Sequence, residues 1–170
     1  RFWDNLNKIL EKCPRVNTTI MSTYNALSVP SYKKLLDGVY GLKKTYGSDD
    51  RYWNSAVFLD ASYLRYPTHQ TVQMLPQKWS NEILQQAQYA DYLGVPLFDN
   101  KHIGYSDIEI QKLKRIFDWM ISADDKNAIN RQRYNFGKFF KEHDIRRGTN
   151  FRETFPEFAD FYNDCQRIKL

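Results

Sequence analysis

The chain has 170 residues and a mass of 20.3 kDa, with 42% hydrophobic and 26% charged residues, which is a composition typical of one globular domain and excludes extensive disorder. No apolar run approaches the roughly 20 residues of a bilayer span, and Cys13 and Cys165 are too few for a disulfide framework, a tetrahedral zinc site or an iron–sulfur cluster. We therefore predict a cytoplasmic protein. The start at Arg1, without a signal pattern, suggests a fragment as much as a processed protein.

The first half of the chain alternates between helical and extended patterns. In chain order we predict a helix over 2–13, a strand and its exit loop over 16–25, a helix over 31–47 and a strand over 56–59. Pro14 ends the first helix, and Ser31 is the expected cap of the second. The continuous apolar run of the last strand is typical of a parallel strand that is covered on both faces.

The pattern from Trp79 onward is helical only. We predict helices that begin at Ser80, at the capping box Ser106–Glu109, at Asp125 and at a second capping box, Thr154–Glu157. The predicted organisation is a region of βα units over 1–78 and a helical extension over 79–170. Because two parallel strands rarely form a durable sheet by themselves, we expect the chain to be the end of a larger α/β fold or to pair with something else.

The net charge of +5 is concentrated in one segment. Residues 126–152 contain eight Lys and Arg against Glu142 and Asp144, a local balance of +6. A solvated helix face explains this segment most simply, and nucleic-acid binding is the alternative. Arg146 and Arg147, which we place in a loop between helices, either face solvent or bind an anion.

Polar side chains follow both predicted strands, where parallel α/β folds bind their ligands. These residues are Ser22, Thr23, Tyr24 and Asn25 after the first strand, and Asp60, Ser62, Tyr63, Arg65, Tyr66, Thr68 and His69 after the second. They form either a polar ligand rim or ordinary strand-exit loops. His69 is an acid–base group, a ligand or a hydrogen-bonded loop residue, and Asp60 is a carboxylate base or a turn cap.

Several common signatures are absent from the sequence. There is no HExxH, CxxC, GxGxxG, P-loop or GxSxG pattern, so metalloprotease, zinc-ribbon, nucleotide-binding and serine-hydrolase interpretations lack their motifs. The phenylalanines at 136, 139, 140, 158 and 161 have the spacing of a helical core, and we interpret them as packing residues and not as base-stacking platforms.

Three stretches together resemble the C-terminal half of a radical S-adenosylmethionine (SAM) protein of the twitch-domain type found in marine viruses and bacteria. They are 17–32 (NTTIMSTYNALSVPSY), 58–70 (FLDASYLRYPTHQ) and 143–157 (HDIRRGTNFRETFPE). The resemblance implies the C-terminal portion of a partial (β/α)6 barrel followed by a helical extension. In that family a CxxxCxxC loop after the first strand holds a [4Fe–4S] cluster, and the fifth and sixth strands form walls for SAM and substrate.

The resemblance also implies roles for individual residues. Thr23 and Asn25 would contact SAM at the exit of the fifth strand, and Tyr63, Arg65 and His69 would lie on the substrate side beyond the sixth. The cluster cysteines are absent, so this chain alone should not cleave SAM and would depend on a missing N-terminal half of the barrel. The rival hypothesis is a non-enzymatic helical module that binds nucleic acid or protein through Lys126–Arg152.

Overall fold

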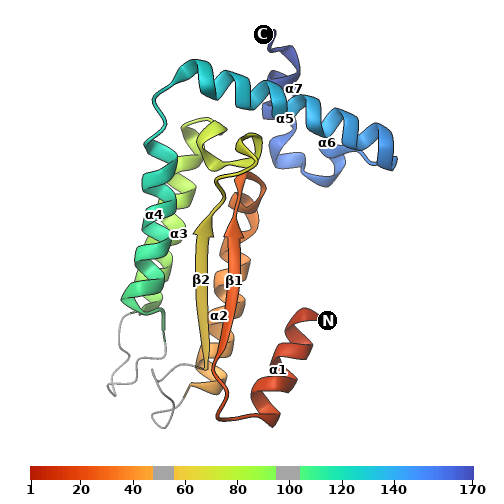
Figure 1. The fold of residues 1–170 in the computed structure, drawn as a ribbon. Helices are drawn as coiled ribbons and strands as arrows, with labels where there is room; N and C mark the ends of the chain where they lie inside the picture. The colour runs from red at the N-terminus through yellow and green to blue at the C-terminus, as the bar shows by residue number, and fades with distance from the viewer. Residues whose placement is uncertain (48–55, 95–103) are drawn as a thin grey trace.

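The structure is a computed structural model that describes residues 1–47, 56–94 and 104–170. Within these ranges the chain is a mixed α/β protein, mostly helical, with one two-stranded parallel sheet (Figure 1). The strands are β1 (Thr18–Tyr24) and β2 (Val57–Tyr63), and the α-helices are α1 (Phe2–Lys12), α2 (Tyr32–Tyr46), α3 (Lys78–Gly94), α4 (Asp107–Ile121), α5 (Lys126–Arg147), α6 (Phe151–Thr154) and α7 (Ala159–Arg167). Short 3-10 turns are η1 (Ala26–Ser31), η3 (Thr68–Gln70), η4 (Val72–Met74) and η5 (Pro156–Phe158). The described strands do not form a barrel.

The two strands pair in parallel from Thr18 beside Val57 to Tyr24 beside Tyr63. At the ends of the ladder, the Thr18 amide donates to the Ala56 carbonyl at 2.9 Å and the Leu64 amide donates to the Tyr24 carbonyl at 2.9 Å. Because the bonding direction alternates along a strand, the backbone groups of residues 19, 21 and 23 point to the outer edge of β1. Those groups have no backbone partner among the described residues.

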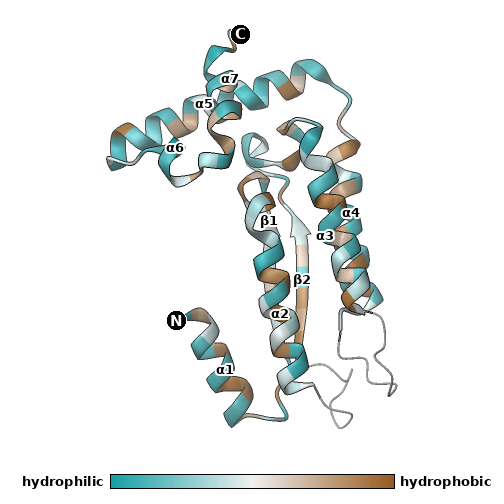
Figure 2. Ribbon diagram, turned by 180° about the vertical axis from the view of Figure 1, so that it is seen from behind, coloured by the Kyte–Doolittle hydropathy of each residue, from teal (hydrophilic) through white to brown (hydrophobic). Residues whose placement is uncertain are grey.

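The helices cover one face of the sheet. Val57, Leu59 and Ala61 are buried on the face packed against α2, and α2 overlies β1 in both views (Figures 1 and 2). On the opposite face Met21 is 82% exposed, and Thr23 is exposed as well. The expectation of cover on both faces is therefore met only in part within the described residues: Lys112 of α4 reaches Phe58 and Asp60 on the second face, but no described helix covers Met21 and Thr23 there.

A buried ion pair fixes α4 along the outer edge of β2. The Glu109 carboxylate accepts from the Leu59 backbone amide at 2.7 Å and lies 2.9 Å from the Lys43 ammonium of α2, with both charged side chains 1% exposed. Glu109 also completes the predicted capping box by accepting from the Ser106 amide at 2.8 Å. One carboxylate thus joins α2, β2 and the start of α4.

Helices α5 to α7 lie across the end of the sheet where the strands finish (Figure 1). The Arg133 side chain of α5 donates to the Met74 carbonyl of η4 at 2.6 Å. Aromatic rings fill the interior of this region, as predicted for all the phenylalanines but Phe139, which is 40% exposed. The Phe136 ring lies 5.5 Å from that of Phe151 and 5.4 Å from that of Phe161. Gly137 lets α7 approach closely, since an added Cβ would lie 3.1 Å from the Cys165 backbone.

Most predicted elements are confirmed, and the differences concern their ends. The Asp125 cap is confirmed, because its carboxylate accepts from the amides of residues 127 and 128. The second strand does not stop at residue 59 but continues to Tyr63, so Asp60 lies in β2 and not in a turn. Asp60 instead pairs with Lys112 of α4 at 2.5 Å.

Four expectations about helix ends are wrong. Ser31 precedes α2, but its side chain makes no capping hydrogen bond and donates to the Ser28 carbonyl instead. Ser80 lies inside α3 and its hydroxyl donates to the Gln77 carbonyl, so it does not cap the helix. Thr154 ends α6 and donates to the Asn150 carbonyl, which replaces the predicted capping box. Arg146 and Arg147 are the last residues of α5 and not a loop, because the helix ends only at Gly148, whose φ of 62° is the left-handed conformation that glycine favours. Within the described ranges, no helix has both the length and the hydropathy that a membrane crossing requires.

Candidate functional site

The predicted site residues all lie at the end of the sheet where the strands finish. Both strand arrows point toward η3, η4 and α5 (Figure 1). Thr23 and Tyr63 are in the last two positions of their strands, whereas Asn25, Arg65 and His69 follow them. The structure thus gathers the two groups of predicted residues on one side of the molecule, which we call the strand-exit end.

Thr23 is paired in register with Ser62 on the uncovered face of the sheet. Both residues are exposed, and neither hydroxyl has a hydrogen-bond partner among the described residues. Neighbouring strands are about 4.8 Å apart, so the two residues lie side by side on this face. They form a small polar surface with free donors and acceptors.

Asn25 has a structural role at the exit of β1. Its side-chain oxygen accepts from the Leu27 amide at 2.9 Å, and its own amide donates to Ser28 Oγ at 3.3 Å, which caps η1. Just before it, the buried Tyr24 hydroxyl donates to Gln86 of α3 at 2.7 Å, and burial raises the Tyr24 pKa. This turn is therefore held in place. Of the Asn25 side chain, only the nitrogen Nδ2 is left for a ligand.

Tyr63 and Arg65 form a second group at the exit of β2. The Tyr63 ring stacks on that of Trp119 from α4, with 4.9 Å between centroids and an 18° angle between planes. An Arg65 nitrogen donates to the Tyr63 hydroxyl at 3.1 Å while the residue stays exposed. Stacking fixes the tyrosine and leaves the remaining guanidinium donors of Arg65 available to an acidic or polar group.

His69 lies against α5, apart from this group. Its ring centroid is 5.0 Å from that of Phe139, and burial lowers the pKa of the imidazole. The shielded Nε2 atom has no hydrogen-bond partner in the described parts of the chain. His69 is therefore partly buried in an apolar setting that disfavours its charged form.

Unpaired polar atoms accumulate at the strand-exit end. Besides His69 Nε2, they include Trp79 Nε1 near the start of α3, Trp119 Nε1 near the end of α4, and Gln132 Oε1 of α5, each shielded from solvent and without a partner among the residues described. Buried polar groups are nearly always paired, so such a concentration needs an explanation by water, a ligand or movement. It marks this end as the candidate functional region.

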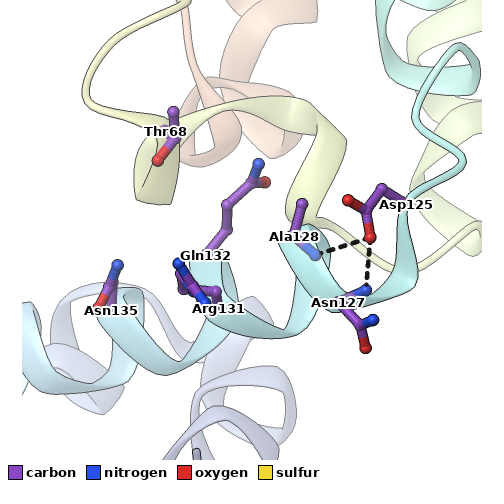
Figure 3. Close-up of a pocket in the computed structure, with 7 residues that line it drawn as sticks. All are labelled: Thr68, Asp125, Asn127, Ala128, Arg131, Gln132 and Asn135. Atoms are coloured by element: carbon purple, nitrogen blue, oxygen red, sulfur yellow. Dashed lines mark hydrogen bonds between the residues drawn. The ribbon is translucent and has the colours of Figure 1, made fainter.

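A hollow of about 370 Å³ opens between η3 and the first half of α5. Six of the seven residues that line it have polar side chains, although the methylene and methyl groups of these residues contribute apolar surface as well: Thr68, Asp125, Asn127, Ala128, Arg131, Gln132 and Asn135 (Figure 3). Of these residues, Thr68 was among the predicted strand-exit residues, and the amides of α5 were missed. The four Asn and Gln residues within 127–135 could have indicated this part of the site from the sequence, because asparagine is a poor helix former.

The cysteines do not fit an iron–sulfur cluster. Cys13 is exposed and Cys165 is buried at the far end of the chain, where burial raises the pKa of its thiol to about 12. A cluster needs thiolates that converge on one point. Among the described residues there is no group of three or more His, Cys, Asp or Glu that could hold a metal ion.

Comparisons with models of known families, with curated proteins and with solved structures found no match to this chain. The interpretation of the site therefore depends on its geometry and on the sequence resemblance.

Proposed function

We propose that the chain is the C-terminal portion of a radical SAM enzyme, in which β1 and β2 are the last two strands of a partial (β/α)6 barrel and the later helices form an extension. In this proposal the chain supplies walls for SAM and for an unidentified substrate. The iron–sulfur cluster, which reduces SAM to start the radical reaction when bound, would be held by a preceding segment. Because no described residues fit the cluster, we derive no step through it.

The one-sided construction of the sheet is the observation that carries the proposal. Helices of a β/α barrel cover the outer face of the strands, while the inner face lines the site. Here α2 packs on one face, and the other exposes Met21, Thr23 and Ser62. The outer edge of β1, with its free backbone groups, is where a preceding parallel strand would pair.

The two edges of the sheet support the same order of strands. The outer edge of β2 is closed by α4, whose Glu109 accepts from the Leu59 amide. A final strand of a partial barrel needs such a closure, whereas the strand before it needs an open edge. Helix α1 also leaves Phe2 and Ile9, seven residues apart on one side, 57% and 48% exposed, an apolar surface that a further element would cover.

Within this proposal the predicted site residues have binding roles. Thr23 would donate to or accept from SAM at the uncovered face, and Asn25 would use its free amide nitrogen. Arg65, whose guanidinium donates to the Tyr63 hydroxyl, would bind a polar or acidic group of the substrate, and His69 would border the substrate space. In this proposal these groups bind and orient SAM and the substrate, and they exclude water from the site.

A SAM titration of the isotope-labelled chain, followed by amide chemical shifts, tests the proposal. We expect millimolar binding with the largest shifts at Thr23, Asn25 and Ser62. Thr23→Val should weaken binding about 3- to 10-fold, the cost of one hydrogen bond. Thr19→Val, on the same face of the same strand but four residues and about 13 Å away from Thr23, is the matched control. Absence of shifts at 10 mM SAM, or equal binding by both variants, would contradict the assignment.

A polyanion-binding module is the second candidate, favoured by the charge of α5. Of its seven Lys and Arg, five form no ion pair with any described acidic residue: Lys126, Arg131, Lys138, Lys141 and Arg147. The helix has 22 residues, about 33 Å at 1.5 Å per residue, enough to follow several phosphates. In this case affinity for duplex DNA should fall steeply between 50 and 200 mM salt, and Lys138→Ala with Lys141→Ala should reduce that slope. Salt-independent or undetectable binding would eliminate this candidate.

A further inference from the structure

We propose that the hollow between η3 and α5 is a binding site for a small neutral ligand rich in hydroxyl groups, such as a monosaccharide. The inference does not depend on the radical SAM proposal, since the residues that line the hollow include none of those assigned to SAM or to the substrate. At about 370 Å³ the hollow falls in the range of small-molecule sites and would accommodate one sugar ring.

The hydrogen-bonding groups of the lining are free. In Figure 3 the Gln132 side chain extends from α5 toward the turn that carries Thr68, with Asn135 and Arg131 beside it. None of these four side chains has a hydrogen-bond partner among the described residues. The Gln132 oxygen is shielded as well as unpaired, so a ligand that reorients this amide would remove an existing cost.

The charges of the lining favour a neutral ligand. Arg131 is the one cation and Asp125 the one acid, and an oxygen of Asp125 already accepts from the amides of residues 127 and 128 (Figure 3). The remaining groups are amides and a hydroxyl, each of which both donates and accepts. A sugar hydroxyl has the same dual capacity, whereas a phosphate ion offers acceptors almost exclusively.

The position of the hollow is fixed before any ligand arrives. η3 is held against α5 by the contact of His69 with Phe139, and the adjacent η4 by the hydrogen bond from Arg133 to the Met74 carbonyl. The two walls therefore belong to one packed unit. Asn127 and Asn135 are exposed on the side of α5 that borders the hollow, so their side-chain amides are available to a ligand.

Titrations of the full chain with D-glucose, N-acetyl-D-glucosamine and D-ribose, each to 20 mM, test the site through amide chemical shifts. Sodium phosphate and SAM are titrated in parallel. We expect at least one sugar to bind in the millimolar range and to shift the amides of Thr68, Ala128 and Arg131. Asn135→Ala should weaken that binding at least 3-fold. Asn130→Ala, an exposed asparagine on the same helix outside the hollow, should leave it unchanged.

Three outcomes would overturn the proposal. They are no sugar binding at 20 mM by a chain with native helical circular dichroism, tighter binding of phosphate than of every sugar, and equal sugar binding by the two asparagine variants. The SAM arm separates the two proposals, because SAM should shift Thr23 and Ser62 and leave Thr68 and Ala128 unmoved. Loss of SAM binding alone would leave the sugar site standing, and loss of sugar binding alone would leave the barrel proposal standing.

Discussion

The two edges of the sheet are built in opposite ways. At the edge of β2, a buried carboxylate accepts from a strand amide, caps α4 and neutralises Lys43. At the edge of β1, the backbone groups of residues 19, 21 and 23 have no partner among the described residues. Exposed strand edges invite pairing, so proteins normally block them. The difference teaches that one edge of the two-stranded sheet is closed by a buried side chain, whereas the other is open among the described residues, as the proposed barrel requires.

Removal of the closure at β2 should have the largest effect. Glu109→Ala removes the carboxylate that pairs with the buried Lys43. It also removes the side-chain acceptor of the Leu59 amide. We expect the free energy of unfolding to fall by about 3–5 kcal/mol, the range for breaking a buried pair. Denaturant unfolding followed by circular dichroism measures it.

The exposed pair of Lys114 and Asp91, on α4 and α3 at 3.0 Å, is the control for Glu109→Ala. Lys114→Ala should cost less than about 1 kcal/mol because solvent screens the pair. Similar losses in the two variants would mean that Glu109 does not close the edge.

The two faces should respond as differently as the two edges. Leu59 is 1% exposed and Met21 is 82% exposed. Leu59→Ala should destabilise the protein by about 2–4 kcal/mol through lost burial and a cavity, whereas Met21→Ala should change stability by less than about 0.5 kcal/mol. The same unfolding measurement compares them. A large loss from Met21→Ala would show that the second face is covered in solution.

Two glycines of α2 test how α1 packs against α2. A Cβ at Gly38 would lie 2.7 Å from the Trp3 ring, while one at Gly41 would meet nothing within 4 Å. Gly41→Ala should stabilise the protein by up to about 1 kcal/mol through helix propensity. Gly38→Ala gains the same propensity but must displace Trp3, so it should be at least about 1 kcal/mol less stable than Gly41→Ala. Equal thermal unfolding midpoints for the two variants would show that the Trp3 ring does not lie against Gly38.

The smallest expected effect concerns pH at the strand-exit end. Burial lowers the pKa of His69 in the folded protein, so below about pH 6.5 the unfolded chain binds more protons at this site. Stability should therefore decrease as the pH falls from 7.5 to 5.5, and His69→Gln should lose less stability over that interval than the wild type. Parallel urea titrations at the two pH values give the difference. An unchanged pH dependence would show that His69 is solvated.

Local signals predicted most of the elements. Periodic apolar residues, Pro14 and the Ser106–Glu109 box act within one or two turns, and the structure confirms the helices and both strands that they indicate. The end of β2 was missed because Asp60 and Ser62 are polar and resemble a turn. Their places in the strand are set by pairing with β1 and by Lys112, a partner 52 residues away.

The candidate site was predicted only in part, for a related reason. The rule that ligands bind beyond parallel strands located Thr23, Tyr63 and Arg65 at one end. The rule does not reveal that α5 crosses this end, because that arrangement depends on the Arg133 and Phe139 contacts with η4 and η3. Gln132 and Asn135 therefore entered the site only through tertiary packing.

Anaerobic reconstitution with iron and sulfide of the longest polypeptide that the gene encodes in frame tests the central claim most directly. If β1 is the penultimate strand of a radical SAM barrel, that polypeptide carries a CxxxCxxC loop, turns brown and binds about four irons per chain. A stop codon immediately upstream of Arg1, or a reconstituted polypeptide without bound iron, would contradict the account.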